Sequence, residues 1–195
     1  MLRKRTLKKI AAVFLGVACI ASVCLARRPV EYSYNFGAVP ISCSIYAEQA
    51  AVNSIHGSDS MGKVLSILGE PKYRTDDSAP QYTYDGIHIK FVDWGGDGRY
   101  TVCNIETNQL GTASTVDGVS VGMPESVLSE IYGTADEVKI EKRMAPKLPE
   151  KELQVYRQRV DEMVTVYTYN ASAAIRMSFT VKKGIITNIL VHVSD

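Results

Sequence analysis

The sequence predicts an α+β protein made of two tandem repeats, each a short helix packed on an antiparallel β-meander of three to four strands. Two observations predict this fold class. The segment "SMGKVLSILGEP" at 60–71 is matched by "PESVLSEIYGTA" at 124–135, and each segment is followed by a tyrosine-rich hairpin and a further strand. One helix on three strands buries little apolar surface, so pairing two such units enlarges the core and covers a sheet edge.

The helices are predicted over 60–69 and 124–133. Aligning the glycine that ends each segment places apolar residues at positions i, i+3 and i+4 of both copies, which is the stripe of an amphipathic helix. Serine or proline at the start and glycine just past the stripe are typical helix boundaries. The aligned pairs are Val64 with Leu128, Ile67 with Ile131 and Leu68 with Tyr132, with Gly69 on Gly133.

Apolar and aromatic residues at every second position predict the hairpins. "YTYDGIHIKF" at 82–91 has such residues on both sides of Asp85-Gly86, a dipeptide favoured in type I′ turns because both central residues need positive φ. "YTYNASAAIRMSF" at 167–179 repeats the tyrosines with a longer turn. Side chains two apart share one face of a strand, so the following are predicted to be largely buried: Tyr84, Ile89, Phe91, Ile175, Met177 and Phe179.

A further strand closes each copy, at 100–107 and at 185–193, and short strands near 53–57 and 117–121 lead into the helices. The first repeat is therefore predicted to span 48–110 and the second to span 111–195. The second carries an insertion at 136–163. Its periodicity leaves two alternatives open, a lengthened hairpin or a short helix from Glu150 to Arg159.

Residues 1–47 are predicted to form a signal peptide or membrane anchor plus a linker. Five basic residues precede an apolar run at 10–26, and Arg27 and Arg28 follow it. The run is slightly long for a signal-peptide core and slightly short for a membrane span, so cleavage, lipidation and retention all stay open. If the segment is retained, the charge asymmetry keeps the N-terminus in the cytoplasm. The rest of the chain is expected to be extracytoplasmic: in the periplasm, on the cell surface or secreted.

The cysteines give no strong indication of a site. Cys19 and Cys24 lie in the apolar run, so only Cys43 and Cys103 are available to an exported domain, where a disulfide is permitted. Cys103 alternates with Thr101 and Ile105 on a predicted strand. We interpret it as a small buried hydrophobic residue, because that is the usual role of a buried cysteine.

Composition and motifs argue against several function classes. The net charge of +1, from 22 basic and 21 acidic residues, does not favour nucleic acid. The chain has no HExxH, GxSxG, GxxxxGK[ST] or CxxC motif. Asp93 and Asp97 in "DWGGDG" are spaced like calcium ligands, but Gly95 replaces the middle oxygen donor, so we interpret the segment as a loop. We expect no enzyme activity, no cofactor and no metal.

The pattern "SDSMGKVLSILGEP", then a Tyr-x-Tyr hairpin, then "SVGMPESVLSEIYGTAD" and a second such hairpin, resembles the helix-plus-sheet repeats of the BamE (SmpA/OmlA) and beta-lactamase-inhibitory-protein group. The resemblance covers roughly residues 50–195. It implies an exported, often lipidated protein that binds other proteins. Copy two departs from the pattern because no proline follows Gly133, and neither Cys19 nor Cys24 lies in a convincing lipobox.

The predicted function is an exported, non-enzymatic protein-binding module of the cell envelope. One alternative is an outer-membrane assembly or enzyme-inhibitor protein of the type that the resemblance implies, and another is an enzyme with an unrecognised site. The partner is expected to be a protein in the envelope or extracellular space. The surface predicted to bind it is the sheet face opposite the apolar one, with a loop tryptophan at its margin, because aromatic, arginine and histidine side chains on a rigid sheet suit protein contacts. The candidate residues are His88, Lys90, Trp94, Tyr100, Arg176 and His192.

Overall fold

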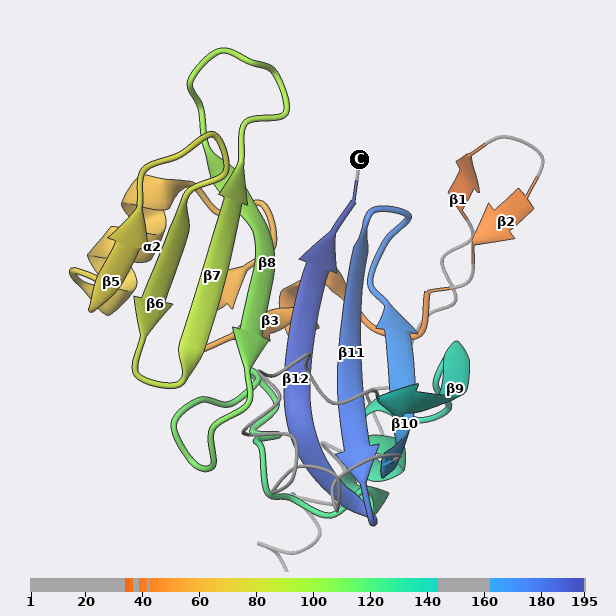
Figure 1. Cartoon of the computed structure of the whole chain (residues 1–195). Coiled ribbons are helices and arrows are strands. Elements are labelled where there is room, and N and C mark those ends of the chain that lie inside the picture. The colour runs from red at the N-terminus through yellow and green to blue at the C-terminus, as the bar shows by residue number, and fades with distance from the viewer. Residues whose placement is uncertain (1–33, 37–38, 42, 144–161, 195) are drawn as a thin grey trace, which may run out of the picture. The chain divides into compact units, whose positions relative to one another are not determined.

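The computed structural model describes residues 34–36, 39–41, 43–143 and 162–194, and these described residues belong to one compact unit. An eight-stranded antiparallel sheet dominates this unit, with the strand order β5-β6-β7-β8-β12-β11-β10-β9 (Figure 1). Its strands are β5 (Tyr73–Thr75), β6 (Gln81–Tyr84), β7 (Ile87–Val92), β8 (Thr101–Thr107), β9 (Glu137–Arg143), β10 (Glu162–Asn170), β11 (Ile175–Lys182) and β12 (Ile185–Val193).

The predicted fold class of two tandem helix-on-meander repeats is wrong. Strands β8 and β12 pair directly, from Ile189 opposite Thr107 to His192 opposite Asn104, so the chain forms one continuous sheet. Side chains from both halves of that sheet belong to a single hydrophobic core. The physical reason is that pairing β8 with β12 satisfies two strand edges at once, which separate meanders would leave open.

Two short helices pack on one face of the sheet. Ser60 caps the start of helix α2 (Met61–Leu68), where its Oγ accepts a hydrogen bond from the Lys63 amide, and Gly69 follows the last residue of the helix. Gly133 follows the last residue of helix α3 (Ser126–Tyr132) in the same way. The predicted helix positions are therefore confirmed. The apolar stripe is narrower than predicted, because Ile67 and Ile131 are exposed.

The remaining elements are small. They are β1 (Tyr34–Phe36) paired with β2 (Val39–Ile41), the 3-10 turn η1 (Ala47–Gln49), and β3 (Ala51–Val52) paired with β4 (Ile55–His56). The strand predicted near 53–57 corresponds to β4. The segment predicted as a strand at 117–121 forms only an isolated bridge, between Ser114 and Ser120. The predicted insertion begins with β9 and ends in the first residues of β10, and these two strands pair antiparallel as a hairpin. The alternative helix at 150–159 lies outside the described residues.

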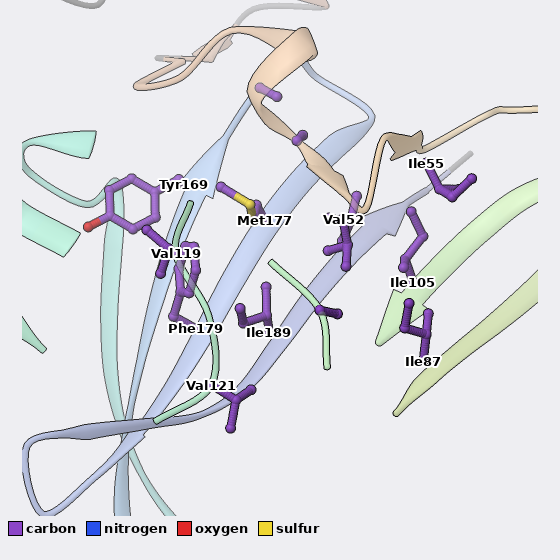
Figure 2. Close-up of a cluster of buried hydrophobic side chains, with 14 of the residues drawn as sticks. Val52, Ile55, Ile87, Ile105, Val119, Val121, Tyr169, Met177, Phe179 and Ile189 are labelled. Atoms are coloured by element: carbon purple, nitrogen blue, oxygen red, sulfur yellow. The ribbon is translucent and has the colours of Figure 1, made fainter. Parts of the chain in front are cut away.

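The core lies between the helices and the sheet face that carries the alternating apolar residues. Figure 2 shows Ile87, Ile105 and Ile189 from neighbouring strands together with Met177 and Phe179, all buried. Of the residues predicted to be buried, Ile89, Phe91, Met177 and Phe179 are 0–1% exposed. Tyr84 and Ile175 are only half-buried. Tyr84 lies near the end of α2, where its hydroxyl donates to the Gly69 carbonyl at 3.1 Å.

The turn at Asp85-Gly86 joins β6 to β7 in the predicted register, with Tyr84 opposite Ile87. It is not the predicted type I′ turn, because Gly86 has a φ of 73° but Asp85 does not have a positive φ. A turn with two positive φ values occurs instead at Lys183-Gly184, between β11 and β12. Gly86 also approaches the side chain of Thr112 so closely that no Cβ would fit there.

Candidate functional site

The sheet face opposite the helices carries a row of polar side chains across its four central strands. The register places Lys90 of β7 opposite Asn104 of β8, Asn104 opposite His192 of β12, and His192 opposite Arg176 of β11. We call these four residues the central row. Adjacent strands lie about 4.8 Å apart, so the row spans roughly 14 Å at the level of the backbone. The structure therefore brings together three of the predicted site residues from distant parts of the chain, Lys90, Arg176 and His192.

A second pair of polar residues lies beside the central row, two residues along β7 and β8. His88 is opposite Glu106, and its Nδ1 atom is 3.3 Å from the Thr83 hydroxyl on β6. The Glu106 carboxylate accepts a hydrogen bond of 2.5 Å from the side-chain amide of Asn188 on β12. Glu106 and Asn188 therefore connect the two halves of the sheet on this face. The predicted residue His88 is exposed next to the central row.

His192 is fixed in orientation by the central row. Its Nδ1 atom lies 2.6 Å from the side-chain carbonyl of Asn104. Burial, and secondarily the neighbouring positive charge of Arg176, hold the pKa of His192 below its ordinary value. The ring is therefore neutral at pH 7. Because a carbonyl oxygen only accepts, Nδ1 carries the proton and Nε2 is the acceptor of the ring.

The two ends of the central row are cationic. Lys90 and Arg176 are both exposed, and neither forms an ion pair with another residue in the described part of the chain. A depression of about 130 Å³ lies beside Lys90, between His88, Asn104 and Glu106. That volume is below the range of about 300–1,000 Å³ that is typical of small-molecule sites. The surface suits contact with a larger partner better than enclosure of a ligand.

Tyr100 is not on this face, which corrects the sequence prediction. The register between β7 and β8 shifts at Lys90/Phe91, so that Lys90 pairs with Asn104 but Phe91 pairs with Val102. Cys103 is therefore an extra residue, a β-bulge, and it reverses the alternation of the residues before it. Tyr100 consequently lies on the same side as buried Val102, half-buried against the hydrophobic core.

Trp94 lies in the loop between β7 and β8, and its side chain is 45% exposed. The loop is held by Asp93, whose carboxylate accepts hydrogen bonds from the backbone amides of Asp97 and Gly98. Asp97 in turn pairs with Arg99. The carboxylates of Asp93 and Asp97 therefore both have partners within the loop. Trp94 is not one of the residues of the central row.

Sequence reasoning did not select Glu106 as a site residue. The signal for it was present, because Glu106 lies two positions after Asn104 and so shares its face of the strand. Its pairing with Asn188 could not be predicted, because it joins residues 82 positions apart.

A larger pocket, which sequence reasoning missed, lies on the helix side of the sheet. It has a volume of about 530 Å³ and is formed by α3, the turn after it, β9 and β10. The hydroxyl of Tyr167 donates a hydrogen bond to the Glu125 carboxylate at this pocket. This bond is the main reason that the pKa of Tyr167 is raised to about 12. The lining residues are Glu125, Ser126, Leu128, Ser129, Gly133, Thr134, Ala135, Val138, Tyr167 and Tyr169.

Within the described ranges, no group of three or more histidine, cysteine, aspartate or glutamate side chains could hold a metal ion. Cys43 and Cys103 are both buried and free. Burial raises the pKa of both thiols, and Asp136 adds to the effect at Cys43. A thiol in such surroundings is a poor nucleophile. The search for a helix able to cross a membrane, which covered the described residues, found none of sufficient length and apolarity.

Comparison with known proteins gives no match, whether with family models, with curated proteins or with solved structures. The resemblance to the BamE and beta-lactamase-inhibitory-protein group therefore stays a hypothesis that rests on the quoted sequence pattern alone.

Proposed function

We propose that this protein is an exported, non-enzymatic module that binds another protein through the central row and the adjoining His88. The observation that carries the proposal is the placement of Lys90, Asn104, His192 and Arg176 side by side on four paired strands. Binding surfaces on paired strands are rigid, so little conformational entropy is lost on association. Arginine is also among the residues that contribute most to protein interfaces.

The charge of the surface defines the chemistry of the partner. Lys90 and Arg176 are cationic and exposed, and Glu106 is already hydrogen-bonded to Asn188. An acidic segment or patch on the partner would therefore be complementary to the two ends of the row. Charge complementarity of this kind mainly raises the association rate and the specificity, and its effect falls as salt is added.

Export is proposed from the N-terminal sequence alone, where basic residues precede the apolar run at 10–26. The partner is accordingly a protein of the envelope or the extracellular space. The N-terminal residue of the protein recovered from its native cells, determined by mass spectrometry, tests this part. An unprocessed chain recovered from the cytoplasmic fraction would contradict export.

The test of the surface uses a partner captured from envelope extracts, identified, and then purified. The double variant Lys90→Ala, Arg176→Ala is expected to bind that partner at least roughly tenfold more weakly than the wild type, with a smaller dependence on ionic strength. The matched control is Lys63→Ala, Arg74→Ala. It removes two exposed cations, one on helix α2 and one on edge strand β5, at positions outside the central row. Equal affinities for the double variant and the wild type would refute the proposed surface.

A further inference from the structure

The pocket beside α3 has the size and lining of a ligand site, and it is unrelated to the surface proposed above because it opens on the helix side of the sheet. Its volume of about 530 Å³ lies within the range of roughly 300–1,000 Å³ that small-molecule sites occupy. The apolar part of the lining comes from Leu128, Ala135 and Val138, with the rings of Tyr167 and Tyr169. Tyr169 and Leu128 are each 1% exposed, so this part of the lining belongs to the rigid core.

One negative charge lies at this apolar lining. Glu125 precedes the first residue of α3, and the residue is half-buried. One of its oxygens accepts a hydrogen bond from the Tyr167 hydroxyl, and no cation pairs with it within the described residues. Tyr167 stays protonated in neutral solution, so it donates to the carboxylate and does not replace its charge. No further side-chain hydrogen bond to this carboxylate comes from the part of the chain that the structure describes, so its second oxygen can accept one from a ligand.

We propose that this pocket binds an organic ammonium ion carried on an apolar body. The ammonium group would donate to the Glu125 carboxylate, and the apolar body would lie against Leu128, Val138 and the ring of Tyr169. Hydrogen bonds between charged groups are stronger than those between neutral groups.

Other ligand classes fit the pocket less well. An anion would meet the negative charge of Glu125 directly. A neutral apolar molecule would cover the carboxylate without supplying a donor, which carries a desolvation cost. A divalent metal ion needs several oxygen ligands, and the pocket lining offers one carboxylate.

The experiment titrates the full chain, labelled with nitrogen-15, with phenethylamine and separately with phenethyl alcohol at pH 7, followed by amide chemical shifts. The amine carries the charge and the alcohol is its neutral counterpart of similar size. Dose-dependent shifts are expected for the amine at the amides of Ser126, Leu128, Ala135, Val138 and Tyr167. The alcohol is expected to bind roughly tenfold more weakly or not at all.

Three variants, at Glu125 and on α3, separate the effect of charge from that of shape. Glu125→Gln keeps an acceptor for Tyr167 but removes the charge, and it is expected to weaken amine binding roughly tenfold. Glu130→Gln removes an exposed carboxylate from the same helix outside the pocket, and it should leave binding unchanged. Ser129→Phe places a ring in the pocket from an exposed position and should abolish binding while the circular dichroism spectrum stays unchanged.

Three results would overturn the proposal. They are equal binding of the amine and the alcohol, unchanged amine binding by Glu125→Gln, and amine-induced shifts that lie outside the pocket.

Discussion

Truncation of Phe91 to alanine tests the assignment of the buried sheet face. The side chain is 0% exposed and its ring meets that of Tyr82 with centroids 4.8 Å apart and planes at 67°. Removing a fully buried phenylalanine leaves a cavity and costs about 3–5 kcal/mol of unfolding free energy. About 0.5–1.5 kcal/mol of that loss is expected from the edge-to-face ring contact.

The assay is urea unfolding followed by far-ultraviolet circular dichroism, with the thermal midpoint as a second measurement. A loss of this size lowers the midpoint temperature by roughly 6–20 °C for a chain of this length. Trp94→Ala is the matched control, since it removes a larger aromatic side chain from the loop that follows β7, where it is 45% exposed. That variant should change the unfolding free energy by at most about 0.5 kcal/mol.

A second substitution tests how much of the lost unfolding free energy depends on the volume of the side chain. Phe91→Leu keeps most of the apolar volume but removes the ring, so its cost should fall well below that of Phe91→Ala. A loss below about 1 kcal/mol for Phe91→Ala would refute the assignment of this face of β7 to the core, and the register reasoning would fail with it.

Three further predictions concern single positions. Gly86→Ala should destabilise the protein by roughly 1–3 kcal/mol more than Gly98→Ala in urea unfolding, because both glycines have positive φ but only Gly86 abuts another side chain, that of Thr112. Ser60→Ala should cost about 1 kcal/mol in the same assay and Ser60→Asp should restore it, since the Ser60 side chain caps α2. Tyr167 has a folded-state pKa of about 12 against an ordinary value of 10.0, so its contribution to stability is complete below pH 10 and is lost as the pH rises to 12. Tyr167→Phe should therefore show a shallower loss of stability than the wild type between pH 10 and 12, and an equally steep loss would contradict the assignment.

The sequence was sufficient for the local features of the fold. The period of two in Ile87, Ile89 and Phe91 identified the buried face of β7 because side chains must alternate along any strand. The ends of α2 were predictable because Ser60 caps its start and the φ of 74° at Gly69 suits glycine. These features depend on neighbours within a few residues.

The features that failed depend on contacts between distant residues. The pairing of β8 with β12 joins residues more than 80 positions apart, and no local pattern specifies which strand edges will meet. The bulge at Cys103 moved Tyr100 from the predicted binding face to the core, and a bulge leaves no residue preference strong enough to be recognised in one sequence. The pocket beside α3 could not be predicted, because β9 and β10 form part of its lining and the periodicity did not show that these two strands pair.

The pairing of β8 with β12 would link binding of the proposed partner to assembly of the sheet. Lys90 and Asn104 are contributed by one half of the sheet, and His192 and Arg176 by the other, so the complete central row exists only once the two halves have joined. A partially folded chain would present half of the row together with an open strand edge. A partner that contacts both halves thus discriminates between the assembled and the unassembled sheet. The binding energy of such a partner would add to the stability of the junction by mass action, and amide hydrogen exchange in β8 and β12 would slow in proportion to the partner's concentration above its Kd.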